Sequence, residues 1–333
     1  MSALLEQPPA PAPAPPTPPA RTGLRGPAWV AVRQHRPALW TALLLAVLSV
    51  GCVVAARVWL GSAGAVVSCG KECTQGTAAS GWFRWAENYA GGATVLLPLL
   101  VAAFTAGPLI ARELQTGMYR LAWTQSVSPA RWLAVRLVGV AAIATAGAVL
   151  LAATFRWSRS RSQEDPLLSM ARSWSDREVY PALGVTAVGY ILLAVALGAL
   201  AAVLLRRTLL ATAVGVAATG GVSLFFAWVR PSLWPVVKTE GDGPFGALSD
   251  PWVVREGVVL ADGSRMTYQQ CLDMGFSKSP CEPGTTPTAV THFFEYHPES
   301  HFWPLQLVET GMVLALAAAC VFAAFKVLGR RHA

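Results

Sequence analysis

Six long runs of apolar residues decide most of what this chain can fold into. They cover residues 38–60, 91–111, 132–154, 181–205, 208–229 and 305–328. An α-helix rises about 1.5 Å per residue, so each run is long enough to cross about 30 Å of hydrocarbon. Backbone groups in lipid must be hydrogen-bonded within their own segment, which makes helices the required form. The sequence predicts an all-α polytopic membrane protein with six transmembrane helices.

The distribution of Lys and Arg predicts the orientation of these spans. With a cytosolic N-terminus, the inside segments are strongly basic, and their acidic residues are only Glu6 and Glu113. The 230–304 loop carries a net charge of about −4 and is predicted to lie outside. The 155–180 loop fits less well because it holds Arg156, Arg159 and Arg161, but an even number of spans keeps it outside. We expect a multi-pass protein of the plasma membrane with both termini cytosolic.

The net charge of +8 is then a topology signal and an attraction to anionic lipid, and we expect no nucleic-acid partner. Four regions follow along the chain. These are a Pro/Ala-rich disordered leader at 1–37, spans one to five at 38–229, an extracytoplasmic loop at 230–304, and span six with a basic tail at 305–333. A cleaved signal peptide is the competing interpretation of the first run. That run continues past Cys52 to Trp59, which favours a retained span.

Cysteine positions point to the outer loops. Cys52 and Cys320 fall within spans, where a thiol is an apolar filler. The other four fall in the predicted outer loops and are disulfide candidates, with free thiols as the alternative: Cys69, Cys73, Cys271 and Cys281. Spacing alone leaves the three possible connectivities open.

A polar insert at 112–128 separates the second and third spans. Leu114, Met118 and Leu121 recur at helical spacing, with Arg112, Glu113 and Arg120 on the flanks, so the pattern predicts an amphipathic cytosolic helix. Ser128 and Pro129 are typical of an N-cap and first helical position, here of the third span. An interfacial helix that lies on lipid without a partner is an equally good interpretation of the pattern.

Three stretches resemble one family. They are the segment from Arg112 to Trp132, with Arg-Glu-Leu at 112–114 and Gly117, the Leu-Arg-Arg-Thr-Leu hairpin at 205–209, and the aromatic stretch at 296–304. Together they resemble actinobacterial membrane permeases of the type-2 ABC exporter class. The chain departs from the family pattern at Leu210, where a proline is usual, and at His301, where an arginine is expected.

The resemblance implies that the insert is a coupling helix that docks on an ATP-binding subunit. It assigns Glu113, Gly117, Arg120 and Trp123 to the coupling surface, beside Arg112, Leu114, Met118 and Leu121 of the amphipathic pattern. The chain has no phosphate-binding loop motif, because its Gly70-Lys71 pair precedes Glu72 rather than Ser or Thr. We therefore expect no cofactor in this chain, ATP bound by a separate ABC subunit, and a second permease protomer that forms a homodimer or a heterodimer.

Charged residues inside spans are functional candidates. Arg57 and Glu309 both fall near the outer ends of their spans, and we hypothesise that they form an ion pair. Arg136 lies near the inner end of the third span and is predicted to extend to the lipid surface. No arrangement typical of a catalytic site is present, and Pro298 interrupts the histidine-rich stretch that would otherwise suggest a metal site.

The sequence thus predicts the membrane subunit of an ATP-driven exporter rather than an enzyme. A non-transporting sensor or assembly protein that binds a cytosolic partner through the same helix is the alternative. A secondary transporter is disfavoured because the spans lack central acidic residues and paired broken helices. The substrate and the direction of transport are not encoded in any of these patterns.

Overall fold

The computed structural model describes residues 47–59 except 49, 78–119, 128–164, 173–241, 243, 250–273 and 289–331. All of these belong to one unit of the chain, Leu44–Ala333. The predicted leader at 1–37 lies outside the described residues, so its disorder stays a prediction.

Five segments of the described chain are long and apolar enough to cross a membrane: Gly81–Thr116, Pro129–Ser160, Thr186–Leu205, Thr208–Ser232 and Glu299–Arg330. They are formed by helices α3 (Ala78–Phe104), α4 (Ala106–Thr116), α6 (Pro129–Glu164), α9 (Thr186–Leu205), α10 (Thr208–Val229) and α12 (Phe302–Arg330). These segments confirm the predicted runs two to six and a multi-pass membrane protein. The predicted run at 38–60 contains the shorter helix Val50–Trp59, and much of it lies outside the described residues.

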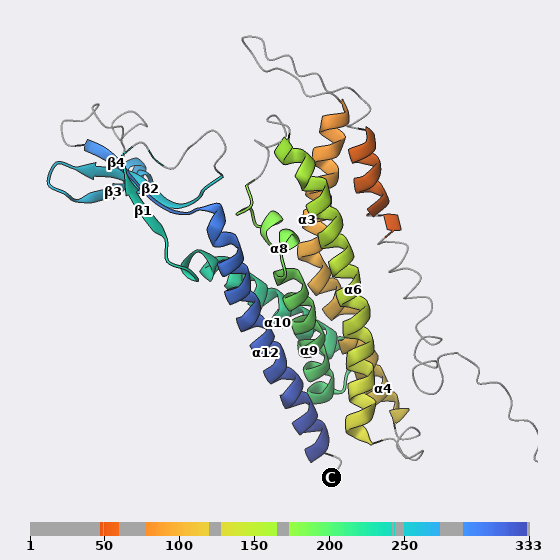
Figure 1. Cartoon of the computed structure of the whole chain (residues 1–333). Coiled ribbons are helices and arrows are strands. Elements are labelled where there is room, and N and C mark those ends of the chain that lie inside the picture. The colour runs from red at the N-terminus through yellow and green to blue at the C-terminus, as the bar shows by residue number, and fades with distance from the viewer. Residues whose placement is uncertain are drawn as a thin grey trace, which may run out of the picture. The chain divides into compact units, whose positions relative to one another are not determined.

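Helix α9 is the centre of the helical bundle. It contacts α3, α4, α6, α10 and α12, as the arrangement in Figure 1 shows. Its sequence is apolar on all sides, and Ala194, Gly198 and Ala202 are all buried, so neighbouring backbones can approach closely. The other spans are buried on one side only, which leaves large apolar side chains such as Leu209, Leu224 and Trp228 exposed.

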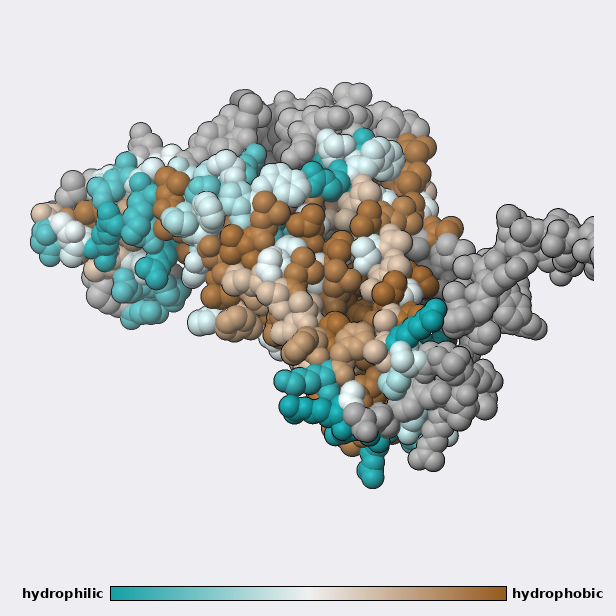
Figure 2. Space-filling view, turned by 60° about the horizontal axis from the view of Figure 1, so that its bottom comes forward, coloured by the Kyte–Doolittle hydropathy of each residue, from teal (hydrophilic) through white to brown (hydrophobic). Residues whose placement is uncertain are grey.

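Exposed apolar residues form a broad region over the helices. Figure 2 shows them in brown, with polar residues in teal on the sheet and at the other end of the helices. Leu209, Leu224 and Trp228 are 85%, 73% and 79% exposed, which is expected where the solvent is hydrocarbon rather than water.

The ends of five helices meet at what we call the α4 end of the bundle. Gln115 of α4 binds Thr208 of α10, Glu113 binds Trp132 of α6, and Arg331 after α12 donates to the Val203 carbonyl of α9. The α9–α10 connection is a tight hairpin, as predicted, in which Arg206 adopts a left-handed φ of 53°. Ser128 caps α6 as predicted, because its Oγ accepts a hydrogen bond of 3.3 Å from the Arg131 N–H.

A four-stranded antiparallel sheet lies at the opposite end, which we call the sheet end. It consists of β1 (Val237–Glu240), β2 (Trp252–Leu260), β3 (Arg265–Thr267) and β4 (Ala289–His297), in the order β1-β4-β2-β3. The short helix α11 (Tyr268–Asp273) follows β3. The prediction of an all-α fold is therefore wrong for the 230–304 segment, although the fold is mostly helical. Prolines and glycines exclude long helices there, and the short pieces between them satisfy their backbone groups by pairing as strands.

The start of the fourth predicted span is also divided. The short helix α8 (Val179–Leu183) ends at Gly184, and α9 begins only at Thr186. The Gln306 side chain of α12 occupies this break, because its Nε2 donates to the Tyr180 carbonyl at 2.7 Å and its Oε1 accepts from the Thr186 N–H at 3.1 Å. A Cβ at Gly184 would collide with the Gln306 amide and displace it from these hydrogen bonds.

Candidate functional site

The candidate site lies at the α4 end, and its shape begins with a break between α3 and α4. Thr105 interrupts the helix, and Pro108 follows three residues later. Proline has no N–H to bond the Phe104 carbonyl and its ring collides with that carbonyl, which explains why the helix breaks there. The Thr105 Oγ1 turns back to donate to the Val101 carbonyl at 2.5 Å. Helix α4 thus packs as a separate element against α9 and α10.

Glu113 joins α4 to α6. Its Oε1 lies 2.5 Å from Arg136 Nη2, and its Oε2 accepts a hydrogen bond of 3.1 Å from Trp132 Nε1. Both carboxylate oxygens are therefore engaged by residues one helical turn apart on α6. The Glu113 and Arg136 side chains are only 12% and 19% exposed, so the ion pair is largely shielded from solvent. The prediction that Arg136 extends to the lipid surface is wrong, because this internal partner holds it.

A second connection joins α4 to α10. The Gln115 Oε1 accepts hydrogen bonds from the Thr208 hydroxyl at 2.9 Å and from the Thr208 N–H at 3.2 Å. The latter is an N–H of the first turn of α10, which has no partner within its own helix. Gln115 therefore acts as a cap supplied by another helix, and α4 is fixed to α6 and α10 within one turn.

Gly117 ends α4. Its φ of 75° lies in the left-handed region that favours glycine, and it forms the C-cap of the helix. The predicted helix at 112–128 is therefore not continuous, because α4 stops at Thr116 and helical structure resumes at Tyr119; residues 120–127 lie outside the described chain. Leu114 is buried whereas Met118 is 61% exposed, so the two do not share one face. Arg112 is exposed, and Arg120, Leu121 and Trp123 lie outside the described residues.

A buried ion pair lies at the sheet end, between Arg230 and Glu309. Arg230 follows α10 in the short 3-10 helix η1 (Arg230–Ser232), and its Nε and Nη2 donate to Glu309 Oε2 and Oε1 at 2.7 and 2.8 Å. Tyr190 Oη donates to the same Oε1 at 2.7 Å, and the Arg230 guanidinium lies 4.1 Å from the centre of the Tyr180 ring. Arg230 and Glu309 are 4% and 0% exposed, so this bidentate pair ties the end of α10 to α12 inside the protein.

The predicted pairing of Arg57 with Glu309 is therefore wrong. Arg57 lies 4.0 Å from the centre of the Trp157 ring and donates to Ser160 Oγ at 3.3 Å, both on α6. Arg230 was missed because it directly follows the fifth apolar run and reads as a loop residue. Arg230 could have been recognised as the partner of Glu309 from its position. It precedes Pro231 at the end of span five, and it lies at the level of Glu309 if spans five and six are antiparallel.

Two histidines meet close to this pair. His297 Nε2 lies 3.0 Å from the Pro231 carbonyl, and His297 Nδ1 lies 3.1 Å from His301 Nδ1 in the 3-10 helix η3 (Glu299–His301). Because the Pro231 carbonyl can only accept, Nε2 of His297 is the donor, and neutral His297 uses Nδ1 to accept from His301. Burial lowers the pKa of His297 below its ordinary value of 6.5, and the neighbouring His301 acts in the same direction.

Acid is expected to destabilise the sheet end through His297. Its folded-state pKa lies below the unfolded value, so the unfolded chain binds more protons and stability falls as the pH drops below 6.5. We expect the thermal midpoint of the purified protein to fall between pH 7.5 and pH 5.5, and the variant H297Q to show a flatter dependence over that range. If the thermal midpoint changed equally with pH in H297Q and in the unmodified protein, His297 would not be the group responsible.

Of the disulfide candidates, the structure describes Cys271 alone, and it is disulfide-bonded. Its partner cysteine lies outside the described residues, as do Cys69, Cys73 and Cys281, so the connectivity stays open. Cys52 and Cys320 are free thiols. Within the described ranges, no group of three His, Cys, Asp or Glu side chains is close enough to hold a metal ion.

Comparison with known proteins gives one family. The model of a family described as ABC-2 membrane transporter related matches residues 38–230. No curated protein and no solved structure matches the chain. The matched region is more than half of the 333 residues and contains α3 to α10, including the Glu113 and Gln115 connections. Together with the five apolar helices, it shows that the chain belongs to the ABC-2 membrane transporter related family.

Proposed function

We propose that this protein is the membrane subunit of an ATP-driven exporter, with six transmembrane helices and both termini cytosolic in the plasma membrane. A separate ABC ATP-binding subunit supplies the energy, and a second permease protomer completes the transport path. The family match supports a membrane permease component. The proposal adds the ATP-binding partner, the direction of transport, and a further transmembrane helix formed by the first predicted run at 38–60.

The observation that carries the proposal is the double attachment of α4. The segment after Gly117 leads from the end of α4 to the start of α6, and both ends are joined by the Glu113 contacts to Arg136 and Trp132. Gln115 adds α10 to the same junction. A force applied to the 117–128 segment is thus transmitted to three membrane helices as one body, which is what a rigid-body conformational change requires.

Charge supports the orientation. The basic residues that gather around the α4 end are Arg112, Arg131, Arg206, Arg207, Lys326, Arg330 and Arg331. Glu113 is the one acidic residue of the described chain among them. By the positive-inside rule this end faces the cytosol, where a nucleotide-binding subunit can reach it. Arg112 and Met118 are exposed at this end, and we assign them, with Gly117, to the docking surface. Arg120, Leu121 and Trp123 lie outside the described residues and are assigned to the same surface from the family resemblance.

Co-purification tests the proposal directly. An ABC ATPase encoded in an adjacent reading frame should co-purify with this chain, and its ATP hydrolysis should rise when the two are combined in lipid. Binding without any effect on hydrolysis would instead favour the non-transporting sensor or assembly protein. Absence of binding would count against both functions.

Gly117 gives a sharper test of the coupling role. Proline fixes φ near −65°, whereas Gly117 requires 75°, so G117P must reorient the chain directly after α4. We expect G117P to lose ATPase stimulation and to insert into the membrane normally, since no span is altered. G117A should show a partial loss, because a left-handed alanine costs about 1–2 kcal/mol.

The control is G92A, in α3. No atom lies within 4 Å of a Cβ at Gly92, and its φ is not positive, so G92A should keep full stimulation. If G117P stimulated the ATPase as well as G92A does, the 117–128 segment would not be the coupling element.

A further inference from the structure

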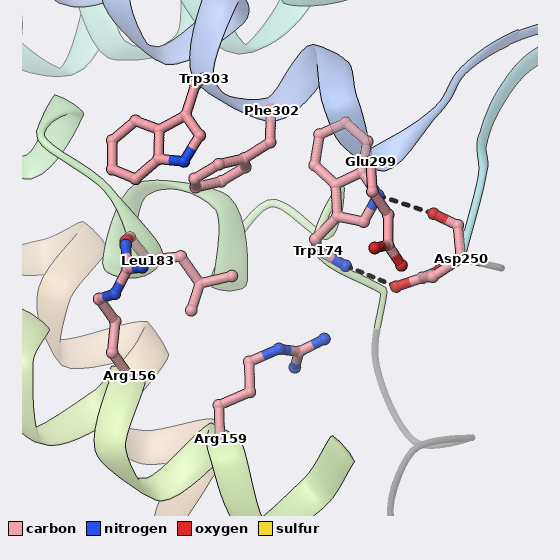
Figure 3. A pocket seen from close by; sticks show the side chains of 8 residues that line it. All are labelled: Arg156, Arg159, Trp174, Leu183, Asp250, Glu299, Phe302 and Trp303. Carbon is pink, nitrogen blue, oxygen red and sulfur yellow. Dashed lines mark hydrogen bonds between the residues drawn. The ribbon is translucent and has the colours of Figure 1, made fainter. Parts of the chain in front are cut away.

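A cavity of about 240 Å³ lies at the sheet end, between α6, α8 and the start of α12. Figure 3 shows its walls, with Arg156 and Arg159 on α6 and with Asp250 and Glu299 on the other side. The volume is room for several water molecules, and it is below the roughly 300–1,000 Å³ of pockets that enclose drug-sized ligands. The cavity therefore suits a compact polar group rather than a whole amphiphile.

The positive wall is formed by two arginines one turn apart. Arg156 and Arg159 are three residues apart on α6, which puts them on the same helix face. Arg156 Nη1 donates to the Leu183 carbonyl at 2.5 Å, and this bond holds the side chain at the cavity. Arg159 is only 9% exposed, so its charge acts where water screens it little. Guanidinium groups bind phosphate in bidentate geometry, which makes this wall suitable for a phosphate.

The opposite wall is acidic and held in place. Asp250 Oδ2 accepts a hydrogen bond of 3.1 Å from the Trp174 N–H, and the Asp250 carbonyl accepts one of 2.7 Å from Trp174 Nε1. Glu299 lies exposed on the same side, one turn before α12. Two carboxylates facing two guanidinium groups across a small cavity favour a ligand that carries both charges.

Aromatic rings line the space between the charged walls. Trp174 and Phe302 meet edge to face, with ring centres 5.9 Å apart. Trp303 is 47% exposed at the rim, where its ring centre is 5.5 Å from the Arg156 guanidinium. Ring faces attract an ammonium group, and partly exposed Trp is typical of the membrane–water interface.

We infer that this cavity binds a zwitterionic phosphate ester, the headgroup of a phospholipid such as phosphatidylethanolamine. Arg156 and Arg159 hold the phosphate, and Asp250, Glu299 and the aromatic rings hold the ammonium group. The acyl chains lie outside, along the apolar helix surfaces. This site gives a role to Arg156 and Arg159, two of the arginines that fit the positive-inside rule poorly. The inference requires no ATPase partner and stands whether or not the protein transports anything.

The test is lipid binding to the purified full chain, measured by native mass spectrometry in detergent. The probes are phosphatidylethanolamine, phosphatidylglycerol, which has the phosphate without the ammonium, and free phosphoethanolamine. We expect phosphatidylethanolamine to bind more tightly than phosphatidylglycerol. R159Q should weaken phosphatidylethanolamine binding about tenfold, the typical effect of losing a hydrogen bond to a charged group. R255Q is the matched control, because Arg255 is an exposed arginine on β2, away from the cavity.

The variant E299Q distinguishes a loss of ammonium binding from a general loss of folding. Glu299 is exposed, so this variant should fold normally, keep phosphate binding and lose the preference for phosphatidylethanolamine over phosphatidylglycerol. Free phosphoethanolamine that binds as tightly as the lipid would support the site and identify a soluble ester as its ligand. Equal binding to R159Q and R255Q, or an unchanged preference in E299Q, would overturn the inference.

Discussion

Replacing Glu309 with alanine is expected to destabilise the protein by about 3–5 kcal/mol, because it leaves a buried arginine without its counter-ion. Arg230 is 4% exposed, and both of its hydrogen bonds to a carboxylate go to Glu309. Tyr190 loses its acceptor in the same variant. The thermal midpoint of E309A in detergent should therefore fall far below that of the unmodified protein, and its yield from membranes should fall with it.

Two matched variants show whether the buried pairing is the cause. K238A breaks the ion pair of Lys238 and Glu295 on the sheet, where Lys238 is 59% exposed, and it should cost less than about 1 kcal/mol. The double variant R230M/E309L removes both charges and should recover much of the stability lost in E309A. A midpoint for E309A within the range of K238A would show that the pair contributes little.

The sequence predicted the helices well where the apolar runs alone decide them. Helix α10 begins at Thr208 and ends at Val229, as the run at 208–229 indicates, and Ser128 caps α6. The predictions failed where local chemistry interrupts a run. Pro108 separates α4 from α3, and Gly117 ends α4 in a left-handed conformation. Both residues are visible in the sequence, but their outcome depends on the packing of α4 against α9.

The candidate site was predictable only in part. Glu113 was selected from the insert pattern and the family resemblance, but its partners Arg136 and Trp132 lie on the next helix. Glu309 was selected as a charge in a span, but its partner was taken from the wrong helix. Tertiary packing determines which helices are neighbours, and the periodicity of a single sequence does not show this. The pairing of strand Trp252–Leu260 with β4 is likewise a contact between distant segments, which the apolar runs do not report.

Three glycines bring the backbones of three helices close together. A Cβ at Gly198 of α9 would lie 2.9 Å from the Gly107 nitrogen and 3.3 Å from the Gly107 Cα, and both are backbone atoms of α4 that cannot move aside like a side chain. A Cβ at Gly215 of α10 would lie 3.4 Å from the Gly198 Cα. The backbones of α4, α9 and α10 therefore meet at one level, close to the Glu113 and Gln115 connections.

Replacing Gly198 with valine is expected to force α4 away from α9. Overpacking of a close contact costs about 1–3 kcal/mol, and here the obstacle is backbone, so the upper part of that range applies. The thermal midpoint of G198V should fall well below that of G221V, because a Cβ at Gly221 in α10 meets nothing within 4 Å and both variants carry the same helix penalty of valine. Since α4 carries Glu113 and Gln115, G198V should also stimulate the ATP hydrolysis of the co-purified partner less than the unmodified protein does, whereas G221V should stimulate it fully. Equal midpoints in the two variants would mean that the helices separate at no cost, and α4 would then be too loosely held to transmit force to the bundle.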